Sequence, residues 1–339
     1  MSTLYLGDCL EVMAGLESES VNCCVTSPPY WGLRDYGVDG QLGLEPTPEE
    51  YVTKMVAVFA EVWRVLRDDG TLWLNLGDSY TQSGMGGNPA ESEYRKQATN
   101  AGSLIPGRRS PPCLKPKNLA GIPWRVALAL QADGWYLRNA IIWAKPNSMP
   151  GSQQDRCTSS YEMVFMLTKS GRYWSDFDAI KTPPRESSLM RLAQQVQMQA
   201  GSHRANGGAK TNGPMRARPG KQRGHSRRHD GFNDRWDAMS RDEQMSAPVM
   251  MRDVWFVPPA CYSGAHYAVM PVEIARRCVL AGCPEGGIAI DPFAGTGTVG
   301  VVCAQWGREF VGVDLDPRSI DQARARLEAA EAQLQLAVT

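Results

Sequence analysis

Ile288-Ala-Ile-Asp291-Pro292-Phe293-Ala294-Gly295-Thr296-Gly297-Thr298-Val-Gly300 is a short apolar run that enters a glycine-rich turn and then opens a helix. α/β sheets bind nucleotide-like ligands at turns of this kind. Glycine is needed there because a Cβ atom would hold the backbone away from the ligand and because the turn uses unusual backbone dihedrals. The stretch predicts an α/β fold with a ligand site at this turn.

An acidic residue at the end of the next strand supports the same site. Phe310-Val-Gly-Val-Asp314 ends in a carboxylate that can accept hydrogen bonds from two ribose hydroxyls, and Asp314 lies 19 residues after Gly295. The ribose-binding acid of a dinucleotide site lies at about this spacing. The glycine pattern alone does not separate NAD from S-adenosylmethionine, and a purely structural tight turn also stays open.

The rest of the chain alternates short apolar runs with longer helical patterns, which is typical of a mostly parallel sheet covered by helices. Strands are predicted at 3–7, 21–26, 71–77, 137–144, 161–168, 288–291 and 309–314. Helices are predicted at 48–67, stopped by Asp-Asp-Gly at 68–70, and at 122–133 and 271–282. A last helix follows Asp316, with Pro317 in its first turn and with Ile320, Ala323, Leu327, Ala330 and Leu334 on one face.

Composition limits the class of protein. A chain of 339 residues allows one large α/β domain with insertions or a core with a satellite. The nine cysteines include no Cys-x-x-Cys pair, so we expect reduced thiols and no metal site. The sequence shows neither a signal peptide nor an apolar stretch of the ~20 residues that span a bilayer, which predicts a cytoplasmic protein without a membrane partner.

Charge is balanced overall but not locally. Lys plus Arg and Asp plus Glu number 36 each, yet residues 185–235 hold eleven Lys or Arg against three Asp or Glu. Such a basic patch is typical of nucleic-acid binding, although a solvated or disordered loop is the other interpretation. Residues 81–118 are rich in Gly, Ser, Asn and Pro and predict a long loop beside the sheet.

A second motif lies near the N-terminus, where the predicted strand 21–26 runs directly into Ser27-Pro28-Pro29-Tyr30-Trp31. Two prolines fix the backbone and remove two amide donors, so the turn presents hydrogen-bond acceptors in a rigid geometry. Acceptors from Ser27 and the Pro28 carbonyl suit an exocyclic amine that must act as a nucleophile. Tyr30 offers a flat face for a base removed from the duplex. The alternative is a proline-rich turn whose aromatic side chains pack into the core.

Together the two motifs resemble the DNA amino-methyltransferases, whose catalytic motif is Asp/Asn/Ser-Pro-Pro-Tyr/Phe and whose cofactor motif contains Phe-x-Gly-x-Gly. The catalytic motif precedes the cofactor motif here, which is similar to the β-class order. The resemblance implies a Rossmann-like S-adenosylmethionine-dependent methyltransferase fold: α/β, with a mixed, mostly parallel sheet, a circularly permuted motif order and an inserted basic DNA-recognition region. It divides the chain into a catalytic half at 1–184, the insertion at 185–250 and a cofactor-binding half at 251–339.

The resemblance also assigns residues. Leu6-Gly7-Asp8-Cys9, Thr71 to Tyr80, Ile142 to Asn147 with Ser160 to Glu162, and Ala265 to Pro271 are weaker matches in collinear order. The implied catalytic residues are Ser27, Pro28, Pro29 and Tyr30. The implied cofactor-binding residues are Asp8, Cys9, Thr26, His266, Asp291, Pro292, Phe293, Ala294, Gly295, Thr296, Gly297, Thr298 and Asp314.

The insertion is the predicted DNA-reading region, with most of its basic side chains on phosphates. The candidate DNA-binding residues are Arg204, Lys210, Arg216, Arg218, Lys221, Arg223, Arg227 and Arg228. The implied partner is double-stranded DNA, and a cognate restriction endonuclease and a homodimer are further partners that the resemblance allows.

The implied reaction is direct methyl transfer without a covalent enzyme intermediate, in which Ser27 orients the amine. Serine at the first motif position favours cytosine N4 over adenine N6 as the target. Three rivals remain: a nicotinamide-dependent oxidoreductase, which leaves the Ser-Pro-Pro-Tyr turn unexplained, a DNA-binding protein without activity, and a methyltransferase that acts on RNA or on a protein glutamine.

Overall fold

The computed structural model describes residues 2–81, 113–148, 153–184, 186, 189–190, 238–260 and 269–338. The chain divides into a core unit, residues 1–180 with 252–339, and a second unit, residues 181–251. The helices of the core unit are α1 (Cys9–Ala14), α2 (Pro48–Val65), α3 (Ile122–Ala132), η3 (Asp178–Ile180), α8 (Val272–Gly282), α9 (Thr298–Gln305) and α10 (Pro317–Val338). Its strands are β1 (Ser2–Leu6), β2 (Val21–Thr26), β3 (Leu66–Leu76), β4 (Tyr136–Ala144), β5 (Tyr161–Thr168), β6 (Val254–Phe256), β7 (Ile288–Asp291) and β8 (Glu309–Asp314).

Among the described residues these strands form one sheet in the order β1-β8-β7-β2-β3-β5-β4-β6. Neighbours are parallel except where β5 pairs with β3 and β4, and both of those pairs are antiparallel. The sheet is therefore mixed and mostly parallel, as the sequence predicted. All seven predicted strands are present; the three-residue β6 and the six-residue α1 were too short to show a periodic pattern.

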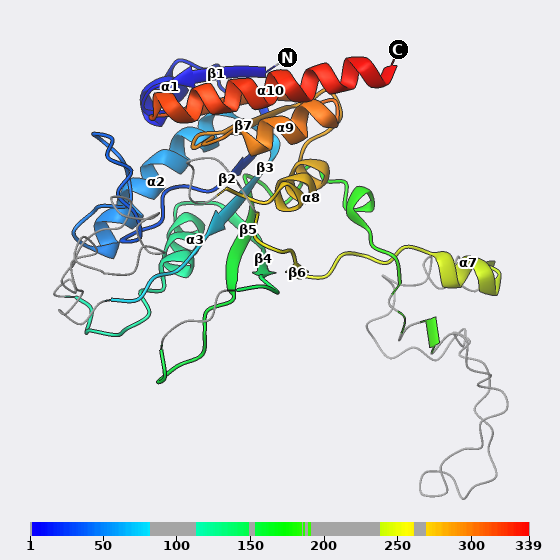
Figure 1. Cartoon of the computed structure of the whole chain (residues 1–339), viewed down its shortest axis with the longest axis horizontal. Helices are drawn as coiled ribbons and strands as arrows, with labels where there is room; N and C mark the ends of the chain where they lie inside the picture. Colours follow the sequence, from blue (N-terminus) through cyan, green and yellow to red (C-terminus); the bar gives the residue numbers. More distant parts are fainter. Residues whose placement is uncertain are drawn as a thin grey trace, which may run out of the picture. The chain divides into compact units, whose positions relative to one another are not determined.

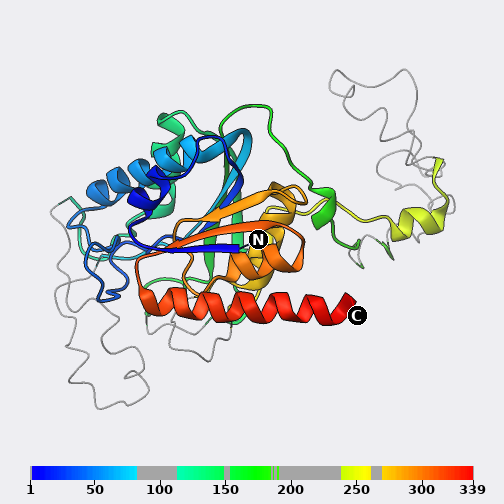
Figure 2. The same cartoon turned by 90° about the horizontal axis from the view of Figure 1, so that it is seen from above.

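Helices cover both faces of the sheet. α1, α2 and α3 pack together on one face, and α8, α9 and α10 pack together on the other (Figure 1; Figure 2). α2 shows why such helices form: Thr47 caps its first turn by accepting a hydrogen bond from the Glu50 amide, and Pro48 occupies the position where no amide donor is needed. Its buried side chains then recur at helical spacing toward the sheet, as predicted.

The boundary between α2 and β3 differs from the prediction. The helix ends at Val65, two residues early, and β3 already begins at Leu66. Leu66 pairs with Val21 while Thr71 pairs with Cys23, so the register shifts between the two pairs. The Asp-Asp-Gly stretch at 68–70 is thus part of an irregular strand and not a turn between helix and strand.

The last helix follows its predicted pattern closely. Asp316 accepts a hydrogen bond from the Arg318 amide at 3.0 Å, and Pro317 opens α10. Ile320, Ala323 and Leu327 are buried, as is Ala330, whereas Leu334 at the end of the predicted face is 37% exposed. The helix therefore packs on the core through its first four turns.

In the second unit, α7 (Arg241–Ser246) begins with a capping box in which Ser240 and Glu243 satisfy each other's backbone amides. Thr182 and Val249 form an isolated antiparallel bridge. Most of the predicted loop 81–118 and all eight candidate DNA-binding residues between Arg204 and Arg228 lie outside the described residues. In the part of the chain that is described, no helix combines the length and the apolar character needed to cross a bilayer.

Candidate active site

Both sequence motifs line one pocket at the carboxyl edge of the sheet. β8, β7 and β2 are parallel neighbours, and they end at Asp314, at Asp291 and directly before Ser27. These three residues line the same pocket, together with Asp8 after β1 and the glycine turn after β7. Two stretches at opposite ends of the sequence are thus brought together, which is the arrangement that the motifs require.

The glycine turn has the unusual backbone dihedrals that the sequence predicted for it. Gly295 and Gly297 have φ values of 51° and 73°, in the left-handed region that disfavours side chains. A Cβ atom on Gly297 would also lie 2.9 Å from the Cβ of Ala323. Gly297 caps α9 without any side-chain hydrogen bond, so the first amides of that helix are not capped by the turn.

Arg326 of α10 holds the outer side of this turn. Its Nη1 donates hydrogen bonds to the carbonyl oxygen of Thr296 at 2.6 Å, to Thr296 Oγ1 at 2.6 Å and to Thr298 Oγ1 at 3.2 Å. Both threonines are buried and line the pocket. The guanidinium therefore fixes the turn from behind while the opposite side of the turn faces the pocket.

Asp314 joins the end of β8 to the glycine turn. One carboxylate oxygen accepts a hydrogen bond from the Gly295 amide at 2.7 Å, and the other accepts one from the Asp316 amide at 2.9 Å. Burial raises the pKa of Asp314 despite these hydrogen bonds. The carboxyl group is held rigidly beside the pocket, and each oxygen keeps a lone pair for a ligand hydroxyl.

Asp291 connects the two halves of the site. Its Oδ1 accepts hydrogen bonds from Thr26 Oγ1 at 2.6 Å and from the Phe293 amide at 3.0 Å. Burial raises the pKa of Asp291 to about 7, because the surroundings disfavour the charged form more than the two hydrogen bonds favour it. The carboxyl group is therefore divided between its neutral and charged forms near pH 7.

Asp8 and Cys9, which follow β1, line the pocket on that side. Asp8 caps α1 by accepting a hydrogen bond from the Leu10 amide at 2.8 Å. Burial, reinforced by the charge of Asp8, raises the pKa of the Cys9 thiol to about 12. Cys9 is therefore a neutral lining group and not a nucleophile.

The serine turn is held by the elements around it. The Pro29 carbonyl accepts a hydrogen bond from the hydroxyl of Tyr51 at 2.9 Å, which ties the turn to α2. Among the described residues no donor reaches the Pro28 carbonyl. Ser27 and Pro29 line the pocket, whereas Pro28 and Tyr30 are not among its lining residues.

Tyr30 lies between the backbone at Gly77, the residue that follows β3, and a set of polar side chains. A Cβ atom on Gly77 would come within 2.5 Å of the Tyr30 ring, so the ring packs directly on that backbone. Its hydroxyl donates to Glu162 Oε2 at 2.6 Å and accepts from Ser27 Oγ at 3.2 Å. Burial, together with the charge of Glu162, raises the pKa of Tyr30 well above its ordinary value. The hydroxyl thus stays protonated, and the ring is in close contact with Gly77.

Sequence reasoning missed two groups of residues at this site. Tyr36, Gln41 and Leu42 line the pocket from the loop that follows the serine turn, and this loop carries no motif in the sequence. Lys145 and Glu162 lie in two stretches of the family resemblance to which it assigned no role. The signal for them was their position, since Lys145 directly follows β4 and Glu162 is the second residue of β5, so each is a charged residue at the end of a strand.

The remaining predicted residues are placed as follows. Pro292, Phe293 and Ala294 line the pocket, whereas Thr26 and Gly297 are not among its lining residues: Thr26 donates to Asp291 and Gly297 is the N-cap of α9. His266 lies outside the described residues. Trp31 packs in the core and donates a hydrogen bond from Nε1 to the Glu45 carbonyl at 2.9 Å.

Comparison with known proteins gives consistent matches along the chain. The family model described as DNA methylase matches residues 21–325. The Type II methyltransferase M.Cfr9I of Citrobacter freundii is 40% identical over 330 residues, which cover 97% of this chain and 89% of that protein. M.XycI of Xanthomonas campestris pv. cyanopsidis is 41% identical, with 96% and 88% covered, and M.SmaI of Serratia marcescens is 40% identical, with 96% and 90% covered.

Solved structures share the fold at lower identity. The cytosine-N4-specific PvuII DNA methyltransferase superposes with a TM-score of 0.57 at 16% identity, covering 96% of this chain and 86% of the other. TTHA0409 of Thermus thermophilus, complexed with S-adenosyl-L-methionine, gives a TM-score of 0.53 at 23% identity, covering 98% and 96%. These likenesses support the arrangement of the sheet and its helices.

Proposed function

Because the chain belongs to the DNA methylase family of the N6/N4 class, we propose that it methylates the N4 amine of cytosine in double-stranded DNA, with S-adenosyl-L-methionine as methyl donor. The observation that carries this proposal is the single pocket lined by both Ser27 and the glycine turn. A nicotinamide-dependent oxidoreductase would use only the second of these features. Because the chain belongs to the DNA methylase family, we do not retain the oxidoreductase hypothesis.

The residues of the pocket fit this methyl donor. The Gly295 backbone leaves room where a Cβ atom would stand, and the Asp314 carboxylate suits a ribose with two hydroxyls. Phe293 and Cys9 supply uncharged surface, and Asp8 and Asp291 supply carboxyl groups. When bound, S-adenosyl-L-methionine supplies an electrophilic methyl group on a positively charged sulfur.

The serine turn would hold the second reactant. Ser27 Oγ and the Pro28 carbonyl are two acceptors on a rigid turn, and they suit the two hydrogens of an exocyclic amine. Holding the amine in one orientation directs its lone pair toward the pocket, and this positioning supplies most of the rate in a reaction without a covalent intermediate. The target base must leave the duplex because its amine cannot be approached in line inside the stack.

Serine at the first motif position is the reason to favour cytosine N4 over adenine N6. The test is to incubate the purified protein with duplex DNA and labelled S-adenosyl-L-methionine, to digest the product to nucleosides and to identify the methylated one by mass. N4-methylcytosine is the expected product. N6-methyladenine would keep the enzyme class and change the target, and no methylated nucleoside would overturn the proposed function.

The division into halves at 1–184 and 251–339 around a DNA-reading insertion at 185–250 is part of this proposal. The insertion carries the excess of Lys and Arg, and the eight basic residues between Arg204 and Arg228 are its candidate phosphate contacts. Replacing four of them with glutamine should weaken DNA binding and lower its salt dependence, while cofactor affinity stays unchanged. An unchanged salt dependence would assign the DNA contacts elsewhere.

The relatives named as Type II methyltransferases suggest a place in a restriction-modification system, with a cognate endonuclease as partner. Sequencing of modified bases in plasmid DNA from cells that express this protein would reveal the recognition sequence. Methylation at scattered cytosines, without a common sequence, would contradict that assignment.

A further inference from the structure

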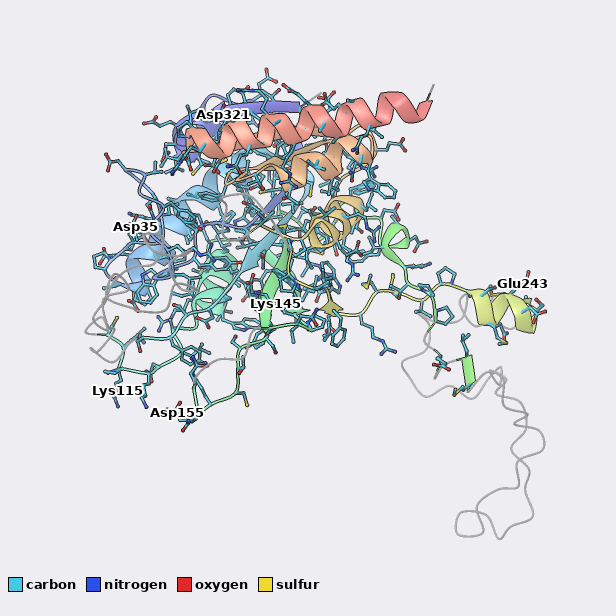
Figure 3. The ribbon with its side chains drawn as sticks, in the orientation of Figure 1. Asp35, Lys115, Lys145, Asp155, Glu243 and Asp321 are labelled. Carbon is cyan, nitrogen blue, oxygen red and sulfur yellow. The ribbon has the colours of Figure 1, made fainter. Side chains whose placement is uncertain are left out.

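Five polar side chains meet at the serine turn, at the same edge of the sheet as the pocket. They come from four neighbouring strands: Ser27 and Tyr30 follow β2, Asn75 lies in β3, Lys145 follows β4, and Glu162 lies in β5. Figure 3 labels Lys145 beside the paired strands β4 and β5. We refer to these five residues as the Glu162 network.

The hydrogen bonds of the network form a chain that ends on a carboxylate. Ser27 Oγ lies 3.2 Å from the Tyr30 hydroxyl, which lies 2.6 Å from Glu162 Oε2. A second contact of the Tyr30 hydroxyl, to Asn75 Oδ1, is longer at 3.2 Å. The shorter bond to a charged acceptor is the stronger one, so the Tyr30 proton points at Glu162.

The charge at the end of the chain fixes the direction of every hydrogen in it. An ionised carboxylate can only accept, so Tyr30 donates to Glu162, and Tyr30 can then only accept from Ser27. Ser27 uses its one proton toward Tyr30 and keeps its lone pairs for the pocket. A serine hydroxyl, which could otherwise donate or accept, is thereby made an acceptor for the target amine.

Two side chains hold Glu162 in this role. Lys145 Nζ forms an ion pair with Glu162 Oε1, and both side chains are mostly buried, with 23% and 14% exposed. Asn75 Nδ2 donates to Glu162 Oε2 at 3.1 Å and to the Met163 carbonyl at 3.1 Å. The carboxylate is therefore paired and oriented by partners on both sides.

We propose that Glu162 is the terminal proton acceptor of the methyl transfer and acts through Tyr30 and Ser27. This inference rests on the proposed function. As the bond between the amine nitrogen and the methyl carbon forms and the carbon–sulfur bond breaks, the electron pair of that bond stays on sulfur. The amine proton moves to Ser27 Oγ, the Ser27 proton to the Tyr30 hydroxyl, and the Tyr30 proton to Glu162. Glu162 ends as a neutral acid and later loses its proton to water.

The network explains how a serine can serve where a stronger base is expected. Neither Ser27 nor Tyr30 needs to carry a charge at any stage, because each passes on one proton as it receives another. Burial keeps the Tyr30 hydroxyl protonated in the resting enzyme, so it has a proton to pass to Glu162 as it receives the one from Ser27. Glu162 is thus a positioning residue in the resting enzyme, and it becomes the acceptor only through the two hydroxyls.

The test compares Glu162→Gln, Tyr30→Phe and the double variant in single-turnover methylation of duplex DNA. Each single variant should be slowed about 100-fold, at the lower end of the effect of a general base, while affinities for DNA and for S-adenosyl-L-methionine stay within about twofold. The double variant should be no slower than either single variant, because both changes break the same chain. The wild type should show a solvent deuterium isotope effect that both single variants lose.

Glu273→Gln is the matched control, since it removes a carboxylate that pairs with Arg276 and Arg277 on α8, away from the network. It should methylate at the wild-type rate. If Glu162→Gln fails to fold because Lys145 loses its partner, Tyr30→Phe alone still tests the chain. Single-variant rates within threefold of the wild type, or losses that multiply in the double variant, would overturn the inference. A wild type that methylates no base would instead overturn the proposed function.

Discussion

The Asp291→Asn variant should have a larger unfolding free energy than the wild type at pH 8. The difference between the two proteins should be much smaller at pH 5. Asp291 is 4% exposed, and its burial raises its pKa from an ordinary value of 3.8 to about 7. The native state therefore binds this proton more tightly than the unfolded state does. The contribution of protonated Asp291 to the unfolding free energy is fully present below pH 3.8 and is lost progressively as the pH rises to about 7.

The size of the effect follows from the two pKa values. The difference between 3.8 and about 7 corresponds to about 4 kcal/mol of unfolding free energy above pH 7. Between pH 5 and pH 8 the change is about 2 to 3 kcal/mol, because part of the loss has already occurred at pH 5. Asparagine is neutral throughout and keeps an oxygen that can accept from Thr26, so the Asp291→Asn variant should lack this dependence.

The assay is urea unfolding of the wild type and of Asp291→Asn at pH 5, 6, 7 and 8 without ligand. Asp321→Asn on α10 is the control, since the side chain of Asp321 is 76% exposed (Figure 3) and its loss should leave the pH dependence unchanged. The advantage of Asp291→Asn over the wild type should grow steadily with pH. An advantage that is the same at pH 5 and pH 8 would refute the reasoning.

Three further predictions concern the core and the pocket. Gly300→Ala should lower the unfolding free energy by about 1 to 3 kcal/mol in urea titrations, because its Cβ atom would lie 2.5 Å from Phe310; an unchanged midpoint would contradict this. Asp314→Asn should weaken S-adenosyl-L-methionine binding by roughly 10-fold in calorimetry, the loss of a hydrogen bond to a charged group, and equal affinity would remove Asp314 from the ribose site. Gly77→Ala should displace the Tyr30 ring and slow methylation at least 10-fold while cofactor affinity is kept; a wild-type rate would show that the ring position does not matter.

Much of the fold could be predicted because its signals are local. Strands such as β2 and β7 are apolar runs that end at a proline or glycine turn. The cap of α10 is formed by residues that are adjacent in the sequence. The start of β3 could not be predicted, because it depends on a register shift against β2. The local sequence pattern predicts that a strand forms, but it does not predict the register in which the strand pairs with its neighbour.

The candidate site shows the same division. The glycine turn and the serine turn are contiguous motifs, and both could be located in the sequence. The Glu162 network could not, because it joins side chains up to 132 residues apart through hydrogen bonds that only the sheet order creates. Arg326 was missed for the same reason, since nothing near it in the sequence indicates that it supports a turn 30 residues earlier.

The hydrogen bond between Thr26 and Asp291 spans 265 residues of chain. β7, the strand that carries Asp291, lies between β8 and β2 in the sheet. β2 therefore lacks one of its two neighbouring strands until that late segment has been synthesised. Contacts of such long sequence separation form slowly during folding and leave a strand edge unpaired in the meantime. A nascent chain on the ribosome would thus carry the serine turn long before it has a pocket, and activity would arise only after β7 and β8 emerge and close the sheet.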